Sequence, residues 1–351
     1  MKVDVYKIAQ SSPDDLSGLQ TLIVSQRLDP QTIVAMMGKT EGNGCVNDFT
    51  RGFAVATLQG YLRPLIGNEL TEQIVFVMSG GTEGVLSPHL TVFTRQTEGL
   101  TGPTRLGLAI CMSHTRDFSM AEIGTMTMVQ VVADGVKRAI AAAGLTAEQV
   151  HLVQIKCPLI TASRQEQGHA VGVQDSYKSM AYSRGASALG VAVALGELQP
   201  DDLTEADICT NYALYSTVAS TSAGVELQNC EILVLGNAPD SHSDWVIGHD
   251  VMAHALDGAA VQRALQSVAG DGDHIVNIFA KAEAAPSGQI LGCRHTMLDD
   301  SDISHTRMAR AVVGAVITSV VQTPMIYVSG GSEHQGPPGG GPIAVISQRQ
   351  P

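Results

Sequence analysis

The sequence has little positive charge and no long apolar run. Lys and Arg together number 21 against 34 Asp and Glu, which gives a formal net charge of -13. This excess of negative charge disfavours a binding surface for nucleic acid or anionic lipid. No segment is apolar over the length of a membrane span, and the N-terminal segment MKVDVYKIAQSSPDDL lacks the apolar core of a signal peptide. We therefore expect a cytoplasmic protein with no nucleic-acid partner and no membrane partner.

Metal and nucleotide motifs are also missing. The six cysteines are scattered without a C-x-x-C pair, and the histidines form no H-E-x-x-H. Free thiols are therefore expected, and a catalytic zinc site has no support. Gly38-Lys39-Thr40 reads GKT, but Ile33 stands where a phosphate loop needs its first glycine. SGGTEG is likewise no dinucleotide motif, so we expect no cofactor for the chemistry.

The chain does have enough apolar residues for a substantial core. Hydrophobic residues make up 44 % of the 351 residues, which is typical of a globular protein. A chain of this length can form two or three modest domains.

A short motif occurs three times along the chain. Its copies are SGGTEG from Ser79, SAGVEL from Ser222 and SGGSEH from Ser329, each reading Ser-small-Gly-x-Glu. Strand-like runs precede the first and third copies, and the second is approached through YSTVASTSAG. Another strand-like run follows each copy: LTVFTR, EILVLGN and PIAVISQ.

Cationic residues repeat in step with this motif. Upstream of each copy, an arginine opens a helical pattern after a residue suited to cap a helix; these pairs are Thr50 and Arg51, Ser183 and Arg184, and Thr306 and Arg307. Further upstream, a lysine ends each of three apolar runs: Lys39, Lys156 and Lys281. The order strand–Lys, helix–Arg, strand–Ser therefore occurs three times and predicts three related units.

The boundaries of these units are predicted at 1–104, 105–242 and 243–351. Each unit also opens with a strand-like and a helical pattern, as in VDVYKI before SPDDLSGLQTLI. This gives about four strands and two helices per unit. We predict an α+β fold with the helices on one face of each small sheet.

Repetition alone indicates shared architecture, so the case for a ligand depends on residue type. Glycine after serine allows close approach to the backbone and leaves N–H donors open. Lysines and arginines gathered at one place repel each other unless something binds among them. The pattern therefore favours a binding site where the three units meet.

At these residues the sequence resembles the cyanuric acid hydrolase and barbiturase family. The matching stretches are GKTEGNGCVNDFTRGFA, SGGTEGVLSPH, QIKCP, YKSMAYSRGASALGVA, STSAGVE, AKAEA, MLDDSDISHTR and SGGSEHQGPPGGGPIAV, which together span almost the entire chain. The resemblance implies three similar domains around a pseudo-threefold axis, with a central barrel-like arrangement of their sheets. It also implies hydrolytic opening of cyclic amides and a homotetramer.

The same resemblance implies roles for particular residues. Lys156 and Ser222 would be the catalytic pair, with the lysine as general base and the serine as nucleophile. The substrate contacts would include the other two Ser–Lys pairs, and we expect them at Arg51, Ser79, Gly80, Arg184, Ser222, Ala223, Arg307, Ser329, Gly330, Lys39 and Lys281. An ordinary lysine is neutral in roughly one molecule in two thousand at pH 7, so neighbouring cations and burial would have to favour the neutral amine.

A structural divalent cation, magnesium or calcium, is implied near the C-terminus. Its ligands would be Glu283, Ser332, Gln335, Gly336, Pro337 and Gly340. The Gly- and Pro-rich run GPPGGGP, which begins at Gly336, also exposes carbonyl oxygens of the kind that hard cations prefer.

Cyanuric acid is the substrate that the overall resemblance favours. Its ring has three carbonyls and three N–H groups, so three converging repeats match its symmetry. Hydrolysis would give carboxybiuret, which can lose carbon dioxide to form biuret. Two alternatives stay open: hydrolysis of barbituric acid to ureidomalonate, and a non-catalytic protein that binds planar heterocycles.

Overall fold

The computed structural model describes residues 1–161, 176–268, 274–298 and 302–349. Residues 299–301 of the stretch MLDDSDISHTR lie outside the described residues. In the described part of the chain, the strands form three four-stranded sheets and one two-stranded hairpin. None of the helices found there is long and apolar enough to cross a membrane.

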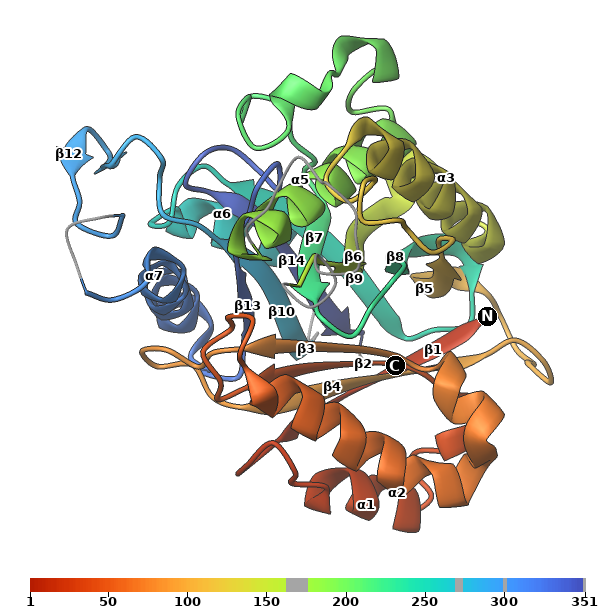
Figure 1. Cartoon of the computed structure of the whole chain (residues 1–351). Coiled ribbons are helices and arrows are strands. Elements are labelled where there is room, and N and C mark those ends of the chain that lie inside the picture. The colour runs from red at the N-terminus through yellow and green to blue at the C-terminus, as the bar shows by residue number, and fades with distance from the viewer. Residues whose placement is uncertain (162–175, 269–273, 299–301, 350–351) are drawn as a thin grey trace.

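The first sheet and its helices come from residues 2–96 (Figure 1). Their bounds are β1 Lys2–Ala9, α1 Ser17–Val24, η1 Pro30–Thr32, β2 Ile33–Thr40, α2 Phe49–Gln73, β3 Val75–Gly80 and β4 His89–Gln96. The helix α2 begins after Asp48, whose carboxylate accepts a hydrogen bond from the Thr50 amide. Gly67, with a φ of 83°, interrupts the helical backbone near its end.

The second sheet and its helices come from residues 105–241. Their bounds are β5 Arg105–His114, α3 Met126–Ala143, η2 Ala147–Gln149, β6 Val150–Pro158, α5 Ser176–Leu195, η3 Pro200–Asp202, η4 Glu205–Asp207, β7 Ala219–Gly224 and β8 Glu231–Ser241. The helix α3 ends at Gly144, which has the left-handed conformation that glycine adopts readily.

The third sheet and its helices come from residues 245–348. Their bounds are β9 Trp245–Met252, α6 Gly258–Gln266, β10 His274–Ala282, β11 Gln289–Ile290, β12 Cys293–Arg294, α7 His305–Val321, β13 Tyr327–Gly330 and β14 Gly341–Gln348. The strands β11 and β12 form a separate hairpin between β10 and α7.

The three sheets have the same topology. Their strand orders are β1-β4-β2-β3, β5-β8-β6-β7 and β9-β14-β10-β13. In each sheet the last strand lies between the first and second and is antiparallel to both, while the second and third are parallel. The prediction of repeated α+β units with four strands each is therefore confirmed. Each sheet falls within one of the predicted ranges, and the described part of each range contains two α-helices.

One apolar core joins the three sheets. Side chains alternate between the two faces of a strand, and one face of every sheet points into this shared core. On β2, for example, Ala35 and Met37 pack into it, whereas Met36 packs against the helices of its own unit. Phe93, Phe279 and Tyr327 contribute aromatic rings, with centroids of neighbouring pairs 6.2 and 5.5 Å apart. A closed barrel of strands stays a prediction.

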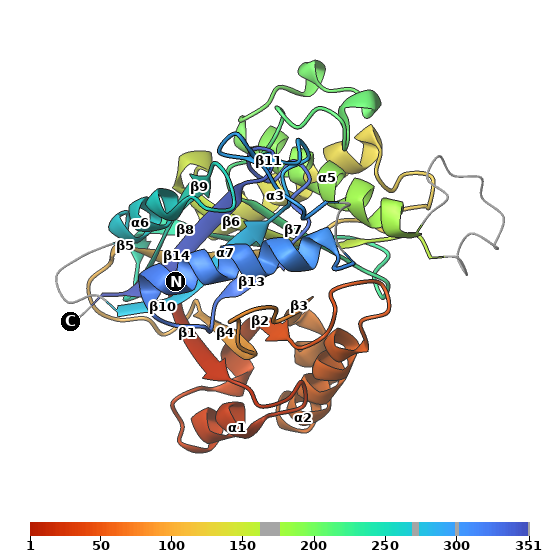
Figure 2. The same cartoon turned by 90° about the vertical axis from the view of Figure 1, so that its left-hand side faces the viewer.

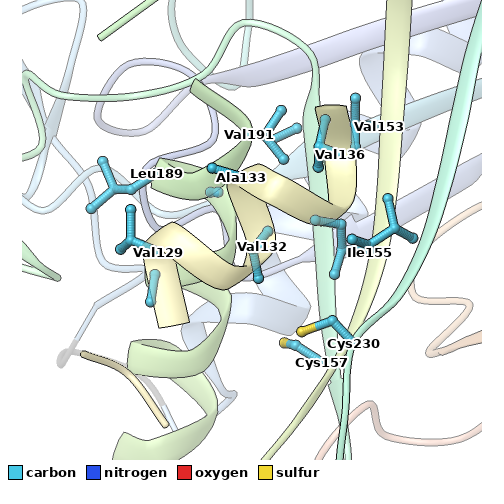
Figure 3. Packing of buried hydrophobic residues seen from close by; sticks show 14 of the residues in the cluster. Val129, Val132, Ala133, Val136, Val153, Ile155, Cys157, Leu189, Val191 and Cys230 are labelled. Carbon is cyan, nitrogen blue, oxygen red and sulfur yellow. The ribbon is translucent and has the colours of Figure 1, made fainter. Parts of the chain in front are cut away.

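The outer face of each sheet is covered by helices. Figure 1 shows α1 and α2 below the first sheet, on the side away from the other two units, and in Figure 2 α7 runs along β10 and β13. In the second unit, α3 lies over β5 and β8 and α5 lies over β6 and β7, and their apolar side chains pack between the two helices and the sheet (Figure 3). The two helices approach closely at Gly190, where an added Cβ would lie 2.7 Å from the Val129 carbonyl oxygen.

The same alternation places the repeated serines and lysines. Lys39 follows Ala35 and Met37 on the inner face of β2, and Ser79 follows Val75 and Val77 on the inner face of β3. The corresponding residues of the other units occupy the same positions on β6 and β7 and on β10 and β13. All six therefore lie at the carboxyl ends of strands, where the shared core ends.

The predicted helix caps are wrong. Asp48 rather than Thr50 precedes α2, α5 already begins at Ser176, and Ser304 precedes α7. Ser183 and Thr306 lie inside their helices. The sequence pattern located each helix, but a serine or threonine inside a helix gives the same signal as a cap. Ser183 instead donates a hydrogen bond to the Pro158 carbonyl oxygen at 2.6 Å.

Candidate active site

A small cavity lies where the three units meet. Residues from all three repeats of the Ser-small-Gly motif contribute to its wall. The lining residues are Gly44, Arg51, Met78, Ser79, Gly80, Met180, Arg184, Ser222, Ala223, Arg310, Ser329 and Gly330. The structure thus brings together the three serines, Gly80, Ala223, Gly330 and two of the three predicted arginines.

In two repeats the lysine contacts the serine directly. Lys39 Nζ donates to Ser79 Oγ at 3.2 Å, and Lys281 Nζ donates to Ser329 Oγ at the same distance. Each lysine Nζ also donates to the carbonyl oxygen of the next glycine, Gly80 at 3.3 Å or Gly330 at 3.4 Å. Each lysine and its serine are register partners in a parallel strand pair, so sheet geometry sets the contact.

These two lysines are almost completely buried. Lys39 is 0 % and Lys281 is 1 % exposed. Burial, together with the cation of Arg310, holds the pKa of Lys39 well below its ordinary value. Burial and the cation of Arg184 lower the pKa of Lys281 to about 7. The free energy cost of a buried ammonium thus favours neutral amines in the site.

The second repeat has a different arrangement. Lys156 and Ser222 are register partners on β6 and β7, as in the other repeats. However, Lys156 forms an ion pair with Glu226, and Ser222 Oγ lies 3.4 Å from Ser329 Oγ. Ser222 is also more exposed than Ser79 and Ser329, both of which are buried.

A tyrosine lies beneath the serines. Tyr327 is on the inner face of β13, two residues before Ser329, and is wholly buried. Burial raises the pKa of its hydroxyl, an effect that the nearby hydroxyls of Ser79 and Ser222 oppose. A neutral phenol, rather than another charge, thus lies next to these serines.

The third arginine at the cavity is Arg310 and not the predicted Arg307. Arg307 is absent from the lining, and its Nε is buried without a hydrogen-bond partner among the described residues. The two arginines lie three residues apart on α7, so one turn of helix decides which reaches the cavity. A sequence signal did exist: a small residue follows Arg51, Arg184 and Arg310, whereas methionine follows Arg307.

The glutamate of the repeated motif is a functional candidate to which the sequence analysis assigned no role. Glu83 accepts two hydrogen bonds from Arg310, at 2.7 and 2.5 Å. Glu333 accepts two from Arg184, at 2.8 and 2.6 Å. These forked pairs orient both guanidinium groups at the cavity. The repeated motif itself contained the signal, since glutamate is the fifth residue of all three copies.

Four of the six predicted metal ligands line a second cavity beside the first. They are Glu283, Ser332, Gly336 and Pro337, together with Glu333, His305 and Tyr212. Gln335 and Gly340 are not in this lining, although Ser332 Oγ donates to the Gly340 carbonyl oxygen at 3.3 Å. Within the described residues, no three His, Cys, Asp or Glu side chains form a group that could hold a metal ion.

The sequence model of the family described as amidohydrolase ring-opening proteins matches residues 4–348. The chain belongs to the ring-opening amidohydrolase family. It is therefore a hydrolase, which agrees with the resemblance that the repeated motifs carry.

Curated relatives match this ring-opening amidohydrolase over nearly its full length. One from Enterobacter cloacae is 50 % identical over 368 residues, covering 99 % of this chain and 100 % of the relative. Another, from Bradyrhizobium diazoefficiens, is 52 % identical over 366 residues, covering 99 % and 98 %. Both are named cyanuric acid amidohydrolase.

Solved structures support the same family. A structure described as a cyanuric acid hydrolase superposes with a TM-score of 0.93 at 47 % identity and covers 99 % of both chains. A cyanuric acid hydrolase from A. caulinodans superposes with a TM-score of 0.92 at 49 % identity, covering 100 % of this chain and 99 % of the other.

The lowered pKa of Lys281 predicts a pH-dependent stability. Between about pH 7 and about pH 9.5, the unfolded chain binds this proton and the folded chain does not, so the free energy of unfolding should rise with pH. The expected contribution is roughly 3 kcal/mol across this range. Urea unfolding of the wild type and of Lys281→Met at both pH values measures it. The variant should lose this part of the increase.

The exposed Lys137 on α3 provides the matched control. Lys137→Met should keep the wild-type increase, because Lys137 lies on the exposed face of α3, outside the buried site. An identical increase in Lys281→Met and the wild type would show that Lys281 stays protonated in the fold.

Proposed function

We propose that this chain opens the ring of cyanuric acid by hydrolysis of one ring amide bond. The observation that carries the proposal is the cavity, whose wall contains one serine and one arginine from each of three equivalent repeats. A planar ring with three carbonyls and three N–H groups presents the same set of atoms to each repeat. The names of the curated relatives support this substrate.

The site provides donors in directions that suit such a ring. Guanidinium groups of Arg51, Arg184 and Arg310 reach the cavity, and forked hydrogen bonds to carboxylates hold two of them. Backbone N–H groups beside the serines add further donors. A glycine or alanine follows each serine, and such a small side chain lets a ligand approach the backbone closely. Such preorganised donors lower the energy of the negative charge that develops on a carbonyl oxygen under attack.

In the proposed reaction, Ser222 Oγ attacks a ring carbonyl carbon while its proton passes to the neutral amine of Lys156. The tetrahedral intermediate collapses by breaking the C–N bond of the ring, and Lys156 returns the proton to the leaving nitrogen. Water then attacks the acyl-enzyme, giving one proton to Lys156, which returns it to Ser222 Oγ. The product is carboxybiuret, which can lose carbon dioxide to give biuret.

Three features support Ser222 as the nucleophile. Ser79 and Ser329 are buried and already accept hydrogen bonds from their lysines, whereas Ser222 is partly exposed. Lys156 is the register partner of Ser222 on β6 and β7, as in the other two repeats, so a base lies beside this serine as well. Ala223 also replaces the glycine of the other copies, which marks this repeat as different. Lys39 and Lys281 would then orient Ser79 and Ser329 toward the other two ring carbonyls.

A direct assay tests the proposed substrate. The purified protein is incubated separately with cyanuric acid and with barbituric acid, and the loss of ring absorbance is followed. Formation of biuret and carbon dioxide from cyanuric acid supports the proposal. Turnover of barbituric acid alone would make the chain a barbiturase, and binding without turnover would make it a non-catalytic binding protein.

We expect Ser222→Ala and Lys156→Ala to lower kcat by about 10³-fold or more while leaving the melting temperature nearly unchanged. Ser79→Ala and Ser329→Ala are the matched controls and should lose less, because those hydroxyls position the ring without becoming acylated. Steady-state kinetics with cyanuric acid provides the measurement. Retention of more than about one hundredth of the wild-type kcat in Ser222→Ala would assign the nucleophile elsewhere.

Arg310→Lys should lower kcat/KM by roughly 10- to 100-fold, because a forked donor becomes a point charge. Arg51→Lys and Arg184→Lys should behave in the same way. Arg307→Lys lies one turn away on the same helix and should stay within about twofold of the wild type. If kcat/KM instead falls in Arg307→Lys and stays normal in Arg310→Lys, Arg307 is the substrate contact, as the sequence predicted.

We also propose a structural magnesium or calcium ion near Glu283. The residues present suit such an ion, because the carboxylate lies at a cavity that Ser332, Gly336 and Pro337 also line. The Gln335 amide is engaged at both ends, with Thr221 N and Gly331 O, so its contribution would be the main-chain carbonyl. A carboxylate with carbonyl oxygens is a donor set for a hard cation. The ion would stabilise the loop that follows Ser329.

Removal of this ion should lower the melting temperature by at least about 3 °C, and activity should fall only as the loop loosens. A chelator titration followed by both melting temperature and rate measures the two effects. A complete loss of activity at unchanged melting temperature, restored by zinc alone, would show a catalytic metal and contradict the serine–lysine mechanism.

A further inference from the structure

The glutamates and arginines of the three repeats form a cycle with one missing link. Glu83 of the first repeat binds Arg310 of the third, and Glu333 of the third binds Arg184 of the second. By the same rule, Glu226 of the second repeat should bind Arg51 of the first. Among the described contacts it does not.

Each partner of the missing link has another contact instead. Glu226 forms an ion pair with Lys156 of its own repeat. Arg51 Nη2 donates to the Cys45 carbonyl oxygen at 2.6 Å, and its Nε lies 3.8 Å from Asp48 Oδ2. Lys156 is therefore the one lysine of the three with a carboxylate partner among the described residues.

The backbone after the serine takes a different course in the second repeat, and this explains why Glu226 does not bind Arg51. In the first and third repeats, Gly81 and Gly331 have φ values of 100° and 79°, which turn the chain at the end of β3 and β13. In the second repeat, Gly224 has no such φ and is the last residue of β7. The glutamate two residues later therefore emerges at a different place.

Glu226 also differs from its counterparts in access to solvent. Its side chain is 52 % exposed, compared with 20 % for Glu83 and 11 % for Glu333. Lys156 and Glu226 line an open cavity that is separate from the substrate cavity, whose lining includes neither of them. Arg51 lines both cavities, so it lies within reach of Glu226.

We propose that Glu226 is the positioning residue that makes the second Ser–Lys pair the reactive one. In the free enzyme it holds Lys156 as an ammonium ion away from Ser222. When a ring occupies the substrate cavity, Glu226 turns to Arg51 and completes the cycle of glutamate–arginine pairs. This inference rests on the proposed function and assigns Glu226 no contact with substrate.

The proton balance of this step is simple. Once the carboxylate leaves, the Lys156 ammonium gives one proton to a water molecule in the open cavity and becomes a neutral amine. The amine can then accept the proton of Ser222 Oγ. Lys156 is 5 % exposed and lines this cavity, whereas Lys39 and Lys281 are 0 % and 1 % exposed and are not among its lining residues. Of the three lysines, Lys156 is thus the one at this cavity, through which the proposed proton transfer to water would take place.

Other charged groups also face Lys156. Glu231 on β8 is its register partner, and burial raises the pKa of that carboxyl. Asp48 and Arg51, from the start of α2, and Glu72, from its end, line the same cavity. Partial desolvation acts to raise the pKa of Glu226, but the charges of Lys156 and Arg51 together have the larger, opposite effect. The pKa of Glu226 therefore lies below its ordinary value. Glu226 is therefore the charged partner of Lys156 near neutral pH.

The test is the pH dependence of kcat/KM for cyanuric acid in Glu226→Gln. A neutral amide no longer holds the ammonium, so the acidic limb should move to lower pH by about one unit. Glu226→Asp keeps the charge and should leave the limb within about 0.3 unit of the wild type. An unmoved limb in Glu226→Gln would reduce Glu226 to a structural role.

Glu83→Gln and Glu333→Gln are the matched controls. Each removes the equivalent carboxylate from a repeat in which that group binds an arginine, so KM should rise while the acidic limb stays in place. If either control moves the limb as far as Glu226→Gln does, the effect is general electrostatics and the proposal is wrong.

A second measurement separates this inference from the proposed function. Acetic anhydride labels neutral amines, and mass spectrometry reads the extent of labelling at Lys156 as a function of pH without any turnover. The midpoint should move to lower pH by about one unit in Glu226→Gln. If the protein hydrolyses neither ring, the proposed function fails while this readout still tests the ion pair. An unmoved midpoint in a protein that turns over substrate overturns only the role of Glu226.

Discussion

Three lysines buried at the end of a single apolar core are the feature on which the site depends. An isolated ammonium in such a place has a large free energy cost, so each lysine needs partners or must become neutral. Lys39 and Lys281 contact serine hydroxyls and glycine carbonyls, and burial lowers the pKa of each. Lys156 instead contacts the carboxylate of Glu226. The three related lysines therefore differ in their partners, and the proposed mechanism assigns them different roles.

The shared core and the site are two parts of one arrangement. Alternating side chains direct one face of each sheet inward, and the same alternation places serine and lysine where the strands end. Helices on the outer faces position the arginines, and glutamates from neighbouring repeats hold two of these. Each repeat therefore completes the site of another, so a single unit could not form it alone.

A nearly threefold site would suit binding of the proposed threefold ring, whereas a single attack on that ring uses one serine of the three. In this chain the asymmetry arises in a few residues after Ser222, where Ala223 and the extended Gly224 replace a glycine turn. The corresponding glycines elsewhere are crowded: an added Cβ at Gly80 would lie 1.7 Å from the Asp48 carboxylate and 2.8 Å from the Gly44 backbone nitrogen. A small local change in backbone thus separates binding repeats from the proposed reactive repeat.

The sequence by itself determined the three units, their strands and helices, and the family, because each depends on local patterns and on a repeated order of residue types. It also placed Ser79, Ser222 and Ser329 together, since equivalent strand ends must meet in a symmetric fold. Only the tertiary structure decided that Arg310 and not Arg307 reaches the cavity, because one helical turn separates two residues of the same kind. The tertiary structure alone also revealed the partners of the three glutamates. Glu83 and Glu333 bind arginines of other repeats, and such contacts cannot be read from local sequence. Glu226 binds the lysine of its own repeat because the backbone after Ser222 takes a different course.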